Sequence, residues 1–122
     1  MVEEQNKNPE IYISKNWIEY NDTINLEQEF KKTEIPIVLY FSANWCGPCK
    51  LMGPELEEKL GTNMNFKVFK INVDKYEDIS NQYNVSVLPT FHIIHKGNEI
   101  ETFCGSKDDL IEKLCKKISS LI

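Results

Sequence analysis

Hydrophobic residues along this chain gather in short blocks separated by polar segments. The block at 35–41 is almost continuously apolar, which predicts a strand covered on both faces and therefore a sheet with helices on either side. Similar β-rich blocks at 66–73 and 90–95 predict two further strands. Residues 17–20 predict one short strand near the start of the chain.

Segments with helical spacing lie between these strands. The expected helices cover residues 22–33, 46–60, 78–83 and 108–122. Asp22 or Thr23 can cap the first of them. In the second, the candidate core positions are Leu51, Met52, Leu56 and Leu60, and Gly61 is a natural stop.

The end of the chain adds a hairpin to this series. Residues 96–98 (Lys-Gly-Asn) predict a turn, and 99–103 predict the returning strand. The predicted order is therefore β-α-β-α-β-α-β-β-α, an α/β fold. We expect a polar tail at 1–10 and one domain over 11–122.

Composition narrows the possible functions. The 122 residues include 19 acidic and 14 basic residues, a net charge of −5, and all the basic residues are lysine. Without arginine, the chain lacks the side chain best suited to phosphate and guanine, so we expect neither nucleic-acid binding nor binding to an anionic membrane. No apolar run is long enough to span a bilayer, and the N-terminus lacks the apolar core of a signal peptide, which predicts a cytoplasmic protein.

Cysteines supply the strongest chemical signal. Four cysteines are too few for a disulfide framework, which favours catalytic, metal-binding or buried thiols. Cys46 and Cys49 are three residues apart where a buried strand passes into a helix, the setting of a redox dithiol. The helix terminus favours a thiolate there. We expect Cys46 to be the exposed nucleophile and Cys49, one turn further in and less exposed, to resolve the mixed disulfide.

The residues between and around the two cysteines refine this prediction. Gly47 lets the backbone approach a partner, and Pro48 fixes φ at the start of the helix, where its missing N–H costs nothing. The run Trp-Cys-Gly-Pro-Cys-Lys at 45–50 resembles the active-site segment of the thioredoxin family. Four further marks in the family's order extend the resemblance over about residues 17–122: the strand at 69–74, the loop at 87–90, the turn at 96–98 and Gly105.

This resemblance implies a thioredoxin fold, a mixed sheet flanked by helices with a cis-proline loop at Pro89. It implies a protein-disulfide reductase in which Trp45, Lys50 and the linker form the active-site loop. Leu88, Pro89 and Gly105 would bind the substrate beside Trp45. It further implies a monomer without a bound cofactor, reduced by an NADPH-dependent thioredoxin reductase and acting on clients such as peroxiredoxins. The linker lacks the histidine of the family's oxidants, which favours a reductant.

One position departs from the family. Tyr40 stands where thioredoxins usually carry a buried aspartate that assists deprotonation of the second cysteine, here Cys49. Tyrosine ionises near pH 10 and is a poor base at neutral pH, and Lys70, which matches the family's buried lysine, loses its usual partner. One hypothesis is slower activation of Cys49, and the other is a simple packing substitution. Tyr40 also motivates an alternative function, a binding or adaptor module with weak redox activity.

The remaining candidates are single thiols and imidazoles. Cys104 precedes Gly105, so the resemblance places it beside the substrate groove as a possible regulatory thiol, open to glutathione or an intermolecular disulfide, or as a small packing residue. Cys115 falls on the apolar stripe of the last helix and is expected to be inert. A zinc site combining the dithiol with His92 and His95 is disfavoured, because residues three apart on a strand point to opposite faces. We therefore expect no metal.

Overall fold

A computed structural model describes residues 12–14, 17–60, 65–105 and 109–122, and within these ranges six strands form one sheet in the order β1-β2-β4-β3-β5-β6. The strands are β1 (Tyr12–Ser14), β2 (Trp17–Glu19), β3 (Ile37–Ser42), β4 (Lys67–Asn72), β5 (Thr90–His95) and β6 (Asn98–Cys104). The three strands β2, β4 and β3 run parallel to one another. The antiparallel pairs are β1 with β2, β3 with β5, and β5 with β6. The sheet is therefore mixed, as predicted.

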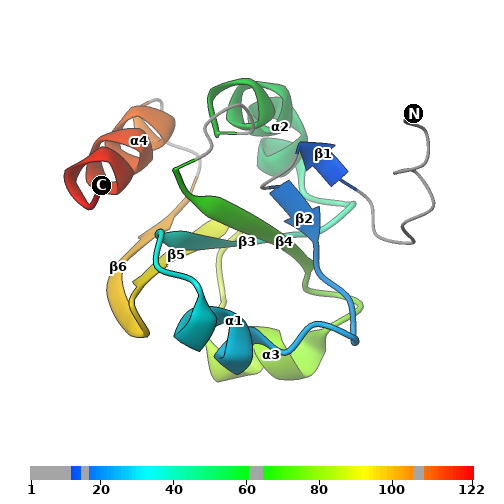
Figure 1. Cartoon of the computed structure of the whole chain (residues 1–122). Coiled ribbons are helices and arrows are strands. Elements are labelled where there is room, and N and C mark those ends of the chain that lie inside the picture. The colour runs from blue at the N-terminus through cyan, green and yellow to red at the C-terminus, as the bar shows by residue number, and fades with distance from the viewer. Residues whose placement is uncertain (1–11, 15–16, 61–64, 106–108) are drawn as a thin grey trace, which may run out of the picture.

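Four described helices cover the two faces of this sheet. They are α1 (Leu26–Lys32), α2 (Gly47–Leu60), α3 (Glu77–Gln82) and α4 (Leu110–Ser120). Figure 1 shows α2 and α4 on one face and α1 and α3 on the other. This layering confirms the α/β prediction made from the apolar block that became β3.

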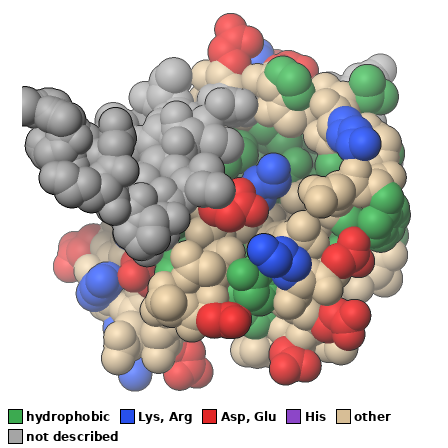
Figure 2. All heavy atoms as spheres, turned by 90° about the vertical axis from the view of Figure 1, so that its right-hand side faces the viewer, with side chains coloured by type: hydrophobic (Ala, Val, Ile, Leu, Met, Phe, Trp, Pro, Cys, Tyr) green, Lys and Arg blue, Asp and Glu red, His purple; other side chains and the backbone are tan. Residues whose placement is uncertain are grey.

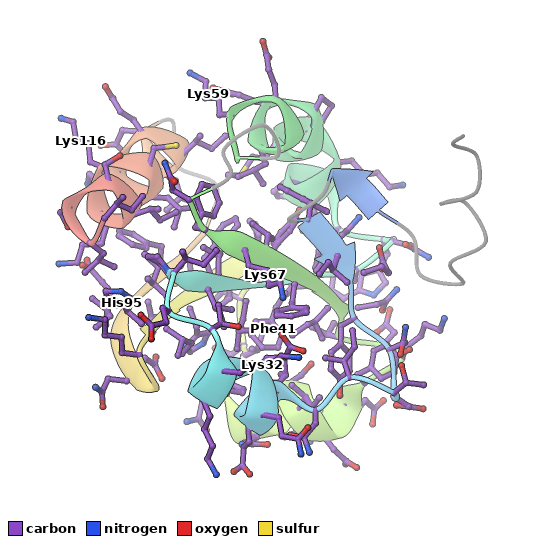
Figure 3. All side chains as sticks on the ribbon, viewed as in Figure 1. Lys32, Phe41, Lys59, Lys67, His95 and Lys116 are labelled. Carbon is purple, nitrogen blue, oxygen red and sulfur yellow. A yellow bond between two sulfur atoms is a disulfide. The ribbon has the colours of Figure 1, made fainter. Side chains whose placement is uncertain are left out.

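Strand β3 lies at the centre and is buried along its whole length. Because successive side chains alternate between faces, Val38 and Tyr40 join the core beneath α2 and α4, whereas Leu39 and Phe41 join the core beside α1 and α3. Figure 3 shows Phe41 on the α1 side of the sheet. Burying a side chain of this size contributes about 2–3 kcal/mol.

Two features near the N-terminus differ from the prediction. Tyr12–Ser14 form an additional strand, β1, paired antiparallel to β2. Helix α1 begins at Leu26 and is capped by Asn25, not by Asp22 or Thr23. Asn25 has an extended backbone and its side chain accepts the N–H of Gln28 at 3.1 Å, which satisfies a free donor of the first turn.

A third difference concerns the core face of α2. Leu56 is completely buried, but Leu51 is 84% exposed and is not a core residue as predicted. Five residues of helix rotate a side chain by about 140°, so Leu51 faces away when Leu56 packs on the sheet. The predicted tail at 1–10, the side chain of Leu60 and the helix stop at Gly61 lie outside what the structure describes.

The hairpin and the final helix agree with the prediction. β5 occupies 90–95, and Lys96 and Gly97 turn with positive φ angles of 54° and 84°. Helix α4 buries Leu110, Ile111, Leu114 and Ile118 on one stripe. None of the described helices combines the length and hydrophobicity needed to cross a bilayer. Lysine and acidic side chains are interspersed over the described part of the face drawn in Figure 2.

Candidate active site

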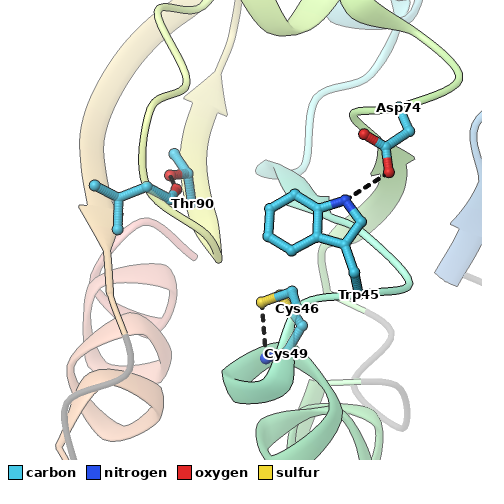
Figure 4. The surroundings of a disulfide bond; sticks show 6 residues. Trp45, Cys46, Cys49, Asp74 and Thr90 are labelled. Carbon is cyan, nitrogen blue, oxygen red and sulfur yellow. Dashed lines mark hydrogen bonds between the residues drawn. A yellow bond between two sulfur atoms is a disulfide. The ribbon is translucent and has the colours of Figure 1, made fainter.

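The two motif cysteines lie at the end of the central strand. β3 ends at Ser42 and α2 begins at Gly47, so Cys46 directly precedes the helix and Cys49 lies in its first turn. A disulfide joins them, with the Cα atoms 5.3 Å apart. The backbone N–H of Cys49 donates to the Sγ of Cys46 at 3.1 Å (Figure 4). A free N–H of the first helical turn and the positive end of the helix dipole therefore both act on this sulfur.

The expected difference in exposure between the two cysteines is wrong for this disulfide form. Cys46 is 3% exposed and Cys49 is 6% exposed, so both are buried. The reason is the turn before the helix, in which the N–H of Cys46 donates to the carbonyl of Ala43 at 3.2 Å and folds the segment back on itself. What distinguishes Cys46 is its hydrogen bond from the helix, not its exposure.

Exposed side chains surround the disulfide. Trp45 is 67% exposed and its Nε1 donates to the carboxylate of Asp74 at 2.7 Å (Figure 4). Gly47 and Pro48 are exposed in the first turn, and no heavy atom lies within 4 Å of where a Cβ on Gly47 would be. The linker thus has open space around Gly47.

The loop before β5 lies against the disulfide. Leu88 is half-buried and packs on the cluster of Ala43, Cys46 and Cys49. The Leu88–Pro89 peptide bond is cis. The N–H of Gly105 donates to the Pro89 carbonyl at 3.0 Å. The structure therefore brings the predicted Leu88, Pro89 and Gly105 together at this edge.

Sequence reasoning noted the segments that contain two further residues of this site but assigned these residues no role. Asp74 orients the Trp45 ring, and Val87, 48% exposed, extends the apolar surface of the loop. The position of Asp74 could have been expected. It follows β4 as Cys46 follows β3, and the carboxyl ends of adjacent parallel strands lie at the same edge of a sheet, so the two residues should be close together.

Tyr40, the residue that departs from the family pattern, lines the same cavity as Cys49. Tyr40 is 2% exposed, stacks on Phe91 at a ring distance of 4.9 Å, and pairs in register with Lys70. Burial raises the pKa of Tyr40 to about 12, against a smaller lowering by a hydrogen bond with Ser42. The hydroxyl is therefore neutral over the physiological range and cannot serve as a base there.

Tyr40 and Lys70 share a cavity of about 420 Å³ with Cys49 and Lys50. Lys70 is half-buried, Lys50 is exposed, and no salt bridge to Lys70 occurs within the described ranges. The predicted neighbourhood of Cys49 is thus assembled, with a neutral phenol in place of a carboxylate.

The other candidates lie elsewhere. Cys104 is exposed on β6, opposite Thr90, and Cys115 is half-buried on α4, where burial raises the pKa of its thiol. His92 is buried and His95 half-buried on β5. Among the residues that the structure describes, no three potential metal-ligating side chains gather in one place.

Comparisons with known proteins agree with this geometry. The family model for thioredoxin matches residues 18–119. Thioredoxin-T of Drosophila melanogaster is 44% identical over 82 residues, 66% of this chain and 52% of that protein, so the match spans about half of the relative's length.

Solved structures give the same result. Thioredoxin NaTrxh of Nicotiana alata superposes with a TM-score of 0.76 at 30% identity, over 88% of this chain and 93% of that one. A structure concerning thiol resolution in a yeast mitochondrial 1-Cys peroxiredoxin by glutathione and thioredoxin systems superposes with a TM-score of 0.73 at 26% identity, over 84% and 92% of the two chains. With its mixed sheet, its Cys46–Cys49 disulfide and these matches, the chain belongs to the thioredoxin family.

Proposed function

We propose that this protein reduces protein disulfides by dithiol exchange, with Cys46 as the nucleophile and Cys49 as the resolving thiol. The observation that carries the proposal is the hydrogen bond from the Cys49 N–H to the Cys46 sulfur at the helix N-terminus. In the reduced protein the same donor would stabilise a Cys46 thiolate, the form of cysteine that attacks disulfides.

Two exchange steps complete the reaction. The Cys46 thiolate attacks one sulfur of the client disulfide, a mixed disulfide forms, and the other client sulfur leaves as a thiolate that takes up a proton. Cys49 then loses its proton and attacks the Cys46 sulfur, which releases the second client thiol and forms the Cys46–Cys49 disulfide. The client gains two electrons and the dithiol loses them.

Recognition of the client would use the apolar side chains around the disulfide and the backbone of the loop before β5. Trp45 and Val87 supply exposed apolar surface near the disulfide, and Leu88 packs directly on the cluster that holds the two sulfurs. An extended client segment could pair with the backbone next to Pro89 as an added strand.

Membership of the thioredoxin family supports a proposal for how the protein is recycled and which proteins it acts on. We propose recycling by an NADPH-dependent thioredoxin reductase and clients that include peroxiredoxins, in line with the yeast structure described above. The protein itself would hold no cofactor. The cytoplasmic location and the monomeric state stay predictions.

The test is NADPH-coupled reduction of insulin disulfides by the full chain and a thioredoxin reductase. We expect turnover to vanish in Cys46→Ser. Cys49→Ser should instead accumulate a mixed disulfide with the client through Cys46, detectable by intact mass. If Cys49→Ser forms no adduct while Cys46→Ser does, the two roles are reversed. If the wild-type dithiol oxidises and reduces chemically without any turnover, the adaptor alternative replaces the reductase.

A further inference from the structure

The cavity beside Cys49 has an unbalanced set of polar groups. It measures about 420 Å³ and is lined by the first half of α2 and by β2, β3 and β4. Among the described residues that line it, the charged side chains are Lys50 and Lys70, and none is a carboxylate. A lysine ammonium group has three N–H donors and no acceptor. The cavity therefore has an excess of positive charge and of hydrogen-bond donors.

Neither ammonium group is neutralised by a neighbouring side chain. Within the described ranges, no salt bridge or hydrogen bond joins the side chain of Lys50 or Lys70 to another residue. Glu19 pairs in register with Lys70 on the adjacent strand β2, so it lies on the same face of the sheet. It forms no ion pair with Lys70 and does not line the cavity. The wall near Cys49 thus keeps its positive charge.

A buried indole adds to this pattern. Trp17 is 2% exposed, lines the same cavity and packs edge-on against Tyr40, with the ring centroids 6.0 Å apart. Its Nε1–H is buried and has no acceptor among the described residues. A buried donor without an acceptor is unfavourable, so a negative charge in the adjoining cavity would be favoured through its field, without direct contact.

We propose that this cavity binds a carboxylate group with Lys50 and Lys70, and that the bound carboxylate accepts the proton of Cys49 when the client is released. The proposal rests on the proposed reductase activity. A carboxylate is negatively charged and has only acceptors, so it complements two ammonium groups. Two sources have this chemistry, a small free acid and an acidic side chain of the client.

The proton and the bonds balance in this step. A carboxylate oxygen takes the proton of the Cys49 thiol, and the Cys49 thiolate attacks the Cys46 sulfur of the mixed disulfide. The bond between Cys46 and the client sulfur breaks, and the Cys46–Cys49 bond forms. The client sulfur leaves as a thiolate and takes up the proton from the carboxylic acid. The carboxylate is thus regenerated and is not consumed.

Binding is tested on the full chain with its disulfide formed. The probes are acetate, which is anionic, and acetamide, which is neutral and of nearly equal size, at constant pH and ionic strength. The ¹H–¹⁵N indole signal of Trp17 reports on the cavity, and that of Trp45, which does not line it, is the internal control. We expect a saturable shift of the Trp17 signal with acetate and none with acetamide.

Lys70→Gln is the test variant and Lys75→Gln its matched control. Lys75 carries the same charge and follows the strand that contains Lys70, but it is exposed and outside this cavity. We expect Lys70→Gln to weaken acetate binding about fivefold while Lys75→Gln leaves it unchanged. Glu19→Gln should strengthen acetate binding, because it removes the carboxylate closest to Lys70 along the ladder.

The effect on the reaction is measured as client release from the Cys46 mixed disulfide in single turnovers. We expect acetate to accelerate release about tenfold at saturation, less than the roughly 10²–10⁴ of a positioned side chain, and to have a smaller effect in Lys70→Gln. Peptide disulfides with glutamate or glutamine beside the cysteine distinguish the two sources. If the client supplies the carboxylate, the glutamate peptide is released faster without acetate, and added acetate accelerates its release less.

Equal shifts with acetate and acetamide would overturn the proposed site. So would equal weakening of acetate binding in Lys70→Gln and Lys75→Gln, because it would assign binding to the overall charge of the protein. Binding without faster release, with acetate or with the glutamate peptide, would overturn the transfer of the Cys49 proton to the bound group. The indole titration requires no turnover, so it decides the carboxylate site even if the protein lacks reductase activity.

Discussion

Replacing Tyr40 by phenylalanine should change how the stability of the protein depends on alkaline pH. The phenol is neutral in the folded protein up to a pKa of about 12, against 10.0 for an unperturbed tyrosine. The folded pKa is raised, so between pH 10 and pH 12 the unfolded chain loses this proton while the folded chain keeps it. The free energy of unfolding therefore falls as pH rises through this window.

The size of the effect follows from the same shift. Each pKa unit corresponds to about 1.4 kcal/mol, and half of the folded phenols are ionised at pH 12, so Tyr40 should remove about 2 kcal/mol of stability by that pH. The phenylalanine of the variant keeps the ring that stacks on Phe91 but has no proton to lose. Urea unfolding followed by circular dichroism at pH 9 to 12, with the disulfide kept oxidised, measures the difference between the two proteins.

All other titrating groups are the same in the wild type and in Tyr40→Phe, so their contributions cancel in the difference. Below pH 10 we expect the difference in free energy of unfolding between the two proteins to be constant. Above pH 10 this difference should change, because only the wild type loses stability through this phenol. Curves that stay parallel to pH 12 would show that the phenol is not held neutral by burial. Burial would then not be what prevents Tyr40 from acting as a base on Cys49 at neutral pH.

Three further predictions concern the proton transfer to and from Cys49, the hydrophobic core and the surface around the disulfide. Tyr40→Asp should accelerate release of the client from the mixed disulfide in single-turnover measurements at pH 7, because a carboxylate beside Cys49 can take its proton; an unchanged rate favours the interpretation of Tyr40 as a packing substitution. Leu114→Ala should lower the free energy of unfolding by about 2–5 kcal/mol because Leu114 is completely buried, whereas Leu51→Ala, at 84% exposure, should stay within about 0.5 kcal/mol. Trp45→Ala should raise KM for a protein disulfide about tenfold with little loss of stability, because the ring is exposed and its loss removes apolar surface next to the disulfide. An equal rise in KM for a small disulfide such as cystamine would contradict a role of Trp45 in client binding.

The sequence predicted the central architecture because long apolar runs and helical stripes leave few arrangements. The apolar block at 35–41 became β3, and 90–95 and the turn after it were placed correctly. Local competition between side chains was harder to foresee. Asn21, Asp22, Thr23 and Asn25 all have capping chemistry, and only the three-dimensional backbone shows that Asn25 is the residue in an extended conformation before the helix.

The site was predicted in part for a similar reason. Motif spacing located Cys46 and Cys49, and the resemblance to thioredoxins located Pro89. The burial of both sulfurs depends on how the segment after β3 turns back, which no spacing encodes. The contact between Trp45 and Asp74 joins residues 29 positions apart, so it requires the parallel pairing of β3 and β4 to be known first.

The outer strand β6 bears on how copies of this protein meet. β6 has a neighbour on one side only, within the described sheet, and Glu99 and Glu101 are both exposed along it. If a second chain added a strand along β6, its backbone would lie next to these carboxylates. The register of β6 is irregular opposite Ile93 and Ile94, so a regular strand would not match its hydrogen-bonding groups. Acidic side chains and an uneven strand therefore oppose polymerisation of this protein through the β6 edge of its sheet.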